Sequence, residues 1–123
     1  MSEDISRLPP QVQERLLRLQ QLQQTLQTVM AQKQQVEMEH TEVDQSLTEL
    51  QKTAADAVIY KAIGSLLVKA EKAKVTEELA ERKELLTTRS TVLARQEERL
   101  RSQAKEVQTK LQEDLNPVSP PSP

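Results

Sequence analysis

A repeat of apolar residues at alternating spacings of four and three constrains this chain more than any other feature. Over residues 8–57, twelve of the fifteen repeat positions are apolar, against six of the other thirty-five. This period of 3.5 residues predicts a helix in a left-handed coiled coil, which we expect over residues 9–55 because proline is tolerated in a first turn. The repeat positions are Leu8, Val12, Arg15, Leu19, Leu22, Leu26, Val29, Lys33, Val36, His40, Val43, Leu47, Leu50, Ala54 and Ala57.

A second, narrower apolar stripe follows over residues 76–115. Thr76 can cap this predicted helix at its start, and Asn116 with Pro117 would end it. The proline-rich residues 116–123 are expected to be a disordered tail. The seven-residue repeat consists of Leu79, Leu86, Leu93, Leu100 and Val107, with companion positions Lys83, Ser90, Glu97, Ala104 and Leu111.

Residues 57–71 differ in composition from both helices. Gly64, the one glycine of the chain, stands with Ser65 between two runs rich in β-branched and apolar residues. This pattern predicts a β-hairpin with Gly64 at positive φ in a type II′ turn. A continuous helix is the alternative, and it would place a glycine-interrupted, β-branched run in mid-helix. The predicted hairpin residues are Val58, Ile59, Tyr60, Ile63, Gly64, Leu66, Leu67 and Val68.

These elements predict a mainly α fold, an antiparallel two-helix coiled coil joined by a single β-hairpin. An isolated two-stranded hairpin is marginally stable in water, and this one would have two apolar faces and two open edges. We therefore expect hairpins of several chains to oligomerise into a shared sheet or barrel.

Apolar residues also continue to the outer ends of both predicted helices. Exposed apolar patches on proteins often mark binding sites, so these residues are candidates for contact with other proteins. Packing of the helix ends against each other is the alternative. The candidates are Ile5, Leu8, Val12, Leu16, Leu17, Val107, Leu111 and Leu115.

Composition excludes several other classes of protein. Without cysteine and with a single histidine, His40, the chain lacks a disulfide framework and a Cys/His zinc site. One glycine cannot build a nucleotide-binding loop, and a net charge of −2 provides no basic excess for nucleic acid. No apolar run approaches a membrane span. We expect a cytoplasmic protein with no catalytic residues, metal or cofactor, in which Arg15, Lys33 and His40 are polar residues of the coiled-coil seam.

The segment DAVIYKAIGSLLVKAEKAKVTEEL, residues 56–79, resembles the prefoldin beta subunit of archaeal type. The flanking stretches QQLQQTLQ and RQEERL are similar to helices of that family, and the chain has room for one hairpin, whereas alpha-type subunits have two. The resemblance covers residues 8–115. Its most specific motif, V-x-Y-K-x-x-G-x-x-L-V, is carried by Val58, Tyr60, Lys61, Gly64, Leu67 and Val68.

The resemblance implies a hexamer of two alpha-type and four beta-type subunits built on a double β-barrel of hairpins. Its coiled coils would hold unfolded client proteins at their tips without ATP and pass them to a group II chaperonin. Arg95, Arg99 and Arg101, interleaved with Glu97 and Glu98, form either an ion-paired solvated face or a chaperonin contact. A structural coiled-coil adaptor is the alternative function, although an adaptor has no need of the hairpin.

Overall fold

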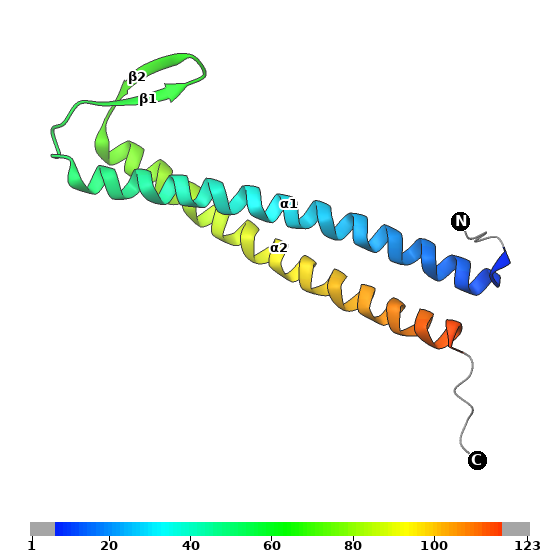
Figure 1. The fold of residues 1–123 in the computed structure, drawn as a ribbon. Helices are drawn as coiled ribbons and strands as arrows, with labels where there is room; N and C mark the ends of the chain where they lie inside the picture. Colours follow the sequence, from blue (N-terminus) through cyan, green and yellow to red (C-terminus); the bar gives the residue numbers. More distant parts are fainter. Residues whose placement is uncertain (1–6, 117–123) are drawn as a thin grey trace. The chain divides into compact units, whose positions relative to one another are not determined.

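The computed structural model describes residues 7–116 and, over that range, contains two long helices and one antiparallel hairpin (Figure 1). This arrangement confirms the predicted fold class. The chain divides into a terminal unit, residues 1–31 with 93–123, and a hairpin unit, residues 32–92. Ile5 and most of the predicted tail, residues 117–123, lie outside the described residues. The elements in chain order are α1 (Pro10–Lys52), β1 (Ile59–Ile63), β2 (Leu66–Ala70) and α2 (Lys72–Leu115).

In the terminal unit, the two helices pack antiparallel through the predicted seam. An ion pair joins Arg15 to Asp114, and a guanidinium nitrogen of Arg101 lies 3.4 Å from the sulfur of Met30, so residue numbers rise along α1 as they fall along α2. All of the buried side chains here stand at predicted repeat positions. They are Val12, Leu22 and Val29 from α1 and Leu93, Ala104 and Leu111 from α2.

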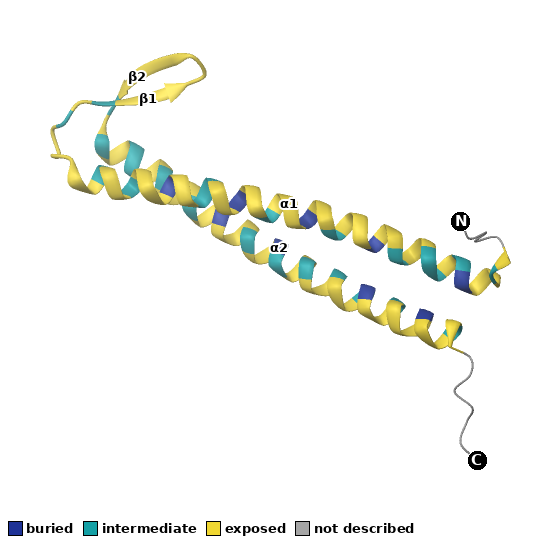
Figure 2. Cartoon of the chain, viewed as in Figure 1, coloured by how far each residue is buried: buried dark blue, intermediate teal, exposed yellow. Residues whose placement is uncertain are grey.

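The hairpin unit has an antiparallel seam of its own, in which Lys83 of α2 pairs with Asp44 of α1. Val36, Val43 and Leu86 are buried there, and Val36 retains only 2% of its surface. Figure 2 shows buried positions recurring along α1 and α2, whereas the hairpin is almost entirely exposed. The apolar periodicity of the sequence therefore becomes a core that the chain forms with itself.

The inner ends of both helices differ from the predicted bounds. The α1 helix ends at Lys52, before the predicted residue 55, because the backbone N–H and the hydroxyl of Thr53 both donate to the Leu50 carbonyl. These short-range bonds provide partners for the Leu50 carbonyl, which would otherwise be free in the last turn, and the helix ends there. The α2 helix begins at Lys72, one turn before the predicted Thr76 cap, because the Val75 N–H already donates to the Glu71 carbonyl at 3.0 Å.

The predicted hairpin turn is present. Ile63 and Leu66 form the closing pair of the ladder, which leaves Gly64 and Ser65 as a two-residue loop. Gly64 has φ +59°, while no other described residue has a positive φ, and these signs are those of a type II′ turn. A Cβ at Gly64 would have no neighbour within 4 Å, so backbone conformation, rather than space, requires glycine here.

Charged and amide side chains cover the helix surfaces outside the seam. On α2, Arg101 pairs with Glu97 at 2.9 Å and Lys110 with Glu106 at 3.5 Å, each four residues apart on one helix face. Neither helix within residues 7–116 combines the length and the apolar character needed to cross a bilayer.

Candidate assembly and client-binding sites

The hairpin has two distinct faces, because side chains alternate along each strand and cross-strand partners share a face. The ladder pairs Ile59 with Ala70, Tyr60 with Lys69, Lys61 with Val68, Ala62 with Leu67 and Ile63 with Leu66. One face therefore carries Ile59, Ile63, Leu66 and Val68. The opposite face carries Tyr60, Ala62 and Leu67.

Both faces are exposed in the single chain. Leu67 on one face is 73% exposed and Leu66 on the other is 65% exposed, and Val58 and Tyr60 are similarly open. Ile59 alone among the predicted hairpin residues is half-buried. Because both strands also have an unpaired edge, the hairpin combines apolar surface with free backbone groups, the two features that favour strand addition from another chain.

Two lysine contacts lie at the hairpin end of the helices, one to the hairpin itself and one between the helix ends. The ammonium group of Lys61 on β1 pairs with the Glu78 carboxylate on α2 at 2.6 Å. Lys72, the first residue of α2, donates to the Thr53 carbonyl just beyond α1 at 2.5 Å. The first contact joins the hairpin to the early turns of α2, and the second joins the start of α2 to the residue after α1. Neither partner could be inferred from the sequence pattern alone.

The candidate client-binding residues of the terminal unit separate into three groups by exposure. Val12 and Leu111 are buried in the seam, while Leu8, Leu16 and Val107 are half-buried. Leu17 and Leu115 are each 59% exposed. The helix ends thus use part of their apolar surface to pack against each other and leave two leucines accessible.

Arg15, predicted as a polar residue of the seam, forms an ion pair near the ends of both helices. Its guanidinium binds the Asp114 carboxylate and lies 3.5 Å from the Lys110 carbonyl, and both side chains of the ion pair are largely buried. Asp114 could not be identified as its partner from the apolar periodicity. If the antiparallel register between α1 and α2 were known, it would place Arg15 opposite Asp114.

The arginines considered for a chaperonin contact are not equivalent. Arg101 pairs with Glu97, as expected for an ion-paired helix face. Within residues 7–116, Arg95 and Arg99 form no ion pair. Both of these side chains are exposed.

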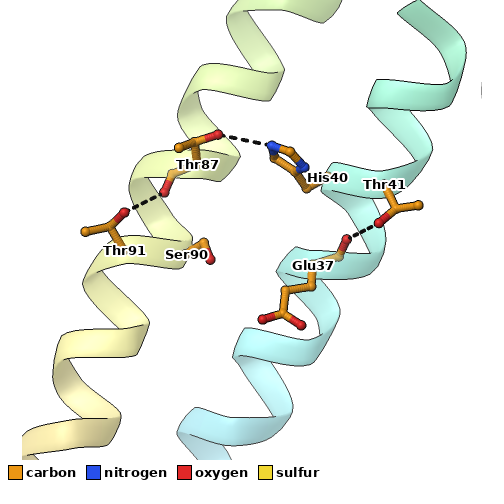
Figure 3. Close-up of a pocket in the computed structure, with 6 residues that line it drawn as sticks. All are labelled: Glu37, His40, Thr41, Thr87, Ser90 and Thr91. Atoms are coloured by element: carbon orange, nitrogen blue, oxygen red, sulfur yellow. Dashed lines mark hydrogen bonds between the residues drawn. The ribbon is translucent and has the colours of Figure 1, made fainter. Parts of the chain in front are cut away.

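Polar side chains also connect the helices in the hairpin unit. The Lys83 ammonium donates to the Asp44 carboxylate at 2.6 Å, and this hydrogen bond and the lysine charge lower the pKa of Asp44. His40, half-buried as predicted for a polar seam residue, lies with Nε2 3.1 Å from the Thr87 hydroxyl (Figure 3).

Comparison with known proteins identifies the family. The model of the family described as Prefoldin subunit matches residues 13–117. The prefoldin beta subunit of Archaeoglobus fulgidus is 49% identical over 110 residues, covering 89% of this chain and 95% of that protein. The beta subunit of Thermococcus onnurineus is 46% identical over 112 residues, covering 91% of this chain and 97% of that protein.

A solved structure agrees in fold and sequence. The crystal structure of the prefoldin beta subunit from Thermococcus strain KS-1 superimposes with a TM-score of 0.80 at 42% identity. It covers 93% of this chain and 97% of its own. The two long helices, the connecting hairpin and the matched sequence lead to one conclusion: the chain belongs to the prefoldin subunit family and is of the beta type.

Proposed function

We propose that this chain acts in an ATP-independent holdase, which binds unfolded proteins at its coiled-coil ends and transfers them to a group II chaperonin. Membership of the prefoldin family makes the chain a chaperone subunit that assembles with other subunits. The proposed complex contains two alpha-type and four beta-type chains in the cytoplasm, joined through a β-barrel of hairpins. Its action needs no catalytic residue, because holding a client requires only reversible contacts.

The observation that carries the proposal is the exposure of Leu17 and Leu115 on the helix ends of the terminal unit. Fully burying a leucine contributes about 1.5–3 kcal/mol, so these half-exposed side chains would each contribute about 1–2 kcal/mol. Such contacts are weak on one subunit. Several subunits on a common base raise the effective concentration of the sites, which gives useful avidity while still permitting release.

Apolar contacts also suit a range of clients, because burial of apolar surface has no directional requirement. An unfolded protein exposes apolar side chains that its folded form covers. The exposed surface of Leu17 and Leu115 would therefore bind unfolded proteins in preference to folded ones, without requiring a particular client sequence.

The test is suppression of client aggregation by this chain co-assembled with an alpha-type prefoldin subunit, without ATP. The double variant Leu17→Asp, Leu115→Asp should lose most of the suppression, because a charge on each leucine opposes apolar contact. The matched double variant Leu85→Asp, Val92→Asp changes two exposed apolar residues of the hairpin unit and should retain it. Light scattering of a denatured client measures both.

Transfer is tested by adding a group II chaperonin and ATP to the held client and measuring recovery of native client. We expect recovery to exceed that from the prefoldin complex alone. Equal suppression by the two double variants would show that clients bind elsewhere. Assembly and helicity that remain normal without any suppression would instead favour a structural adaptor.

A further inference from the structure

An ion pair joins the two helices of the terminal unit close to their ends. Arg15 is the sixth residue of α1, and Asp114 is the second-last residue of α2. The Arg15 guanidinium also lies 3.5 Å from the Lys110 carbonyl, one turn back along α2. Because the buried side chains of this seam are apolar, the ion pair is a contact of a different kind from those around it.

The ion pair stands directly beside hidden apolar surface on both helices. Val12 precedes Arg15 by three residues and Leu111 precedes Asp114 by three, so each shares a helix face with its charged neighbour. Both of these apolar side chains are buried, and Leu16 next to Arg15 is half-buried. Separation of the helix ends at the ion pair would therefore expose apolar side chains from α1 and α2 together.

The apolar contacts and the ion pair differ in what an unfolded client could replace. An apolar segment of a client could take over the contacts of Val12 and Leu111, because apolar burial has no directional requirement. The same segment has no charge to offer Asp114. This carboxylate lies in the last turn of α2, where the negative end of the helix dipole disfavours it, and Arg15 supplies the compensating charge. The ion pair is thus the part of the closed ends that an apolar client cannot replace.

The start of α1 keeps its helical form through bonds of its own. The Gln13 side-chain amide donates to the Leu8 carbonyl at 2.7 Å. The backbone N–H groups of Val12 and Gln13 donate to the Pro9 carbonyl at 2.9 and 3.1 Å. Because these bonds lie within α1 and pair groups of its first turn, the helix end can move away from α2 without unfolding.

We propose that the ion pair of Arg15 with Asp114 is a latch that sets how much apolar surface the helix ends offer to an unfolded client. With the latch formed, Leu17 and Leu115 are exposed at these ends. With the latch broken, Val12 and Leu111 join them, and a client that binds this larger surface shifts the population toward the open form. The inference rests on the client-binding function proposed above and adds a means of regulating it.

Opening of the ends is measured as a distance between two nitroxide labels on one chain by electron paramagnetic resonance. The chain has no cysteine, so Gln11→Cys and Gln112→Cys, at exposed positions, place one label on each helix end. Labelled chain is diluted with unlabelled chain and co-assembled with an alpha-type subunit, so that distances within one chain dominate. Arg15→Gln should raise the longer-distance population about threefold to fivefold, the range that a partly exposed ion pair provides, with unchanged helicity by circular dichroism.

Two controls separate the latch from the charge alone. Lys110→Gln removes a positive charge from the same helix end but breaks only the same-helix pair with Glu106, so the distances should not change. The double variant Arg15→Asp, Asp114→Arg exchanges the two charges and should return the distances toward those of the unaltered chain. Equal distances in Arg15→Gln and Lys110→Gln, or no recovery in the charge exchange, would overturn the latch.

Client holding completes the test. Arg15→Gln should suppress aggregation of a denatured client at about a third to a fifth of the concentration that the unaltered chain requires, because more of the ends are open. Open ends without stronger holding would overturn the regulatory role. If the latch alone is wrong, Arg15→Gln changes neither distance nor holding, while Leu17→Asp, Leu115→Asp still loses suppression. If clients bind elsewhere, that leucine double variant instead retains its suppression, and the proposal falls with the client-binding function.

Discussion

The helical seam and the hairpin use similar apolar residues with opposite outcomes. In the seam, Val36 is 2% exposed because α1 and α2 cover it from within the same chain. In the hairpin, Leu67 is 73% exposed because two strands cannot cover either of their own faces. The seam is complete in one chain, and the hairpin is not.

This difference separates two contributions to stability. Burial in the seam stabilises the individual chain and should depend little on protein concentration. In the proposed assembly the hairpin would be buried only on association, so its burial would stabilise the assembled form by mass action. Changes in the two regions should therefore affect different measurements.

The largest expected effect comes from placing a charge on the hairpin. Leu67→Glu would bury an uncompensated carboxylate in an assembled barrel at a cost of about 3–5 kcal/mol, which lowers the association constant by roughly a hundredfold to several thousandfold. Size-exclusion chromatography with light scattering, in the presence of an alpha-type subunit, measures the loss. Leu85→Glu, at a leucine of α2 that is 66% exposed, is the control. Equal assembly of the two variants would mean that Leu67 is not at an interface.

A truncation in the seam should show the reverse pattern. Val36→Ala removes buried methyl groups and leaves a cavity, so we expect a loss of about 2 kcal/mol in the free energy of unfolding. Urea unfolding followed by circular dichroism measures this loss, and assembly under native conditions should persist. Met38→Ala, an exposed change nearby on α1, should cost less than about 0.5 kcal/mol. Similar costs for both would argue against a packed seam at Val36.

The ion pair of the terminal unit should have a smaller effect. A double-mutant cycle with Arg15→Gln and Asp114→Asn should give a coupling energy of up to about 1 kcal/mol, because the two side chains are only partly exposed. The same-helix pair Arg101 and Glu97 should give about 0.3–0.5 kcal/mol. A coupling near zero for Arg15 with Asp114 would show that this contact does not fix the helix ends.

The smallest effect concerns pH. Lys83 lowers the pKa of Asp44 from its ordinary value of 3.8, so the pair contributes stability above that value. This contribution is lost as pH falls through the lower pKa of the folded state. Lys83→Met should raise the pKa of Asp44, as measured by NMR titration of its carboxyl carbon. Lys74→Met, which alters a lysine outside this pair, should leave that pKa unchanged, and an unchanged value in Lys83→Met would contradict the assigned cause.

The periodic features of the sequence predicted the seam and the hairpin well. Val12, Leu22, Val29, Val36 and Val43 all occupy predicted repeat positions, because the spacing of apolar residues specifies which side of a helix is covered. Gly64 likewise fixed the turn, because the two-residue loop requires a positive φ at its first position.

The polar contacts could not be obtained in the same way. Periodicity identifies the buried face of each helix but not the register between two helices, which depends on where α1 ends and α2 begins. The Arg15 pair with Asp114 and the His40 contact with Thr87 both require that register. The early start of α2 escaped prediction because the Glu71 carbonyl, rather than the Thr76 side chain, begins the helix.

The most direct test of incomplete burial in the single chain is hydrogen–deuterium exchange on this chain alone and co-assembled with an alpha-type subunit. Amides of residues 59–70 should gain strong protection on assembly, because neighbouring strands would bond their free edges. Amides of the seam should change little, since the chain already covers them. Hairpin amides that exchange equally fast in both states, or protection gained mainly along the seam, would contradict assembly through the hairpin.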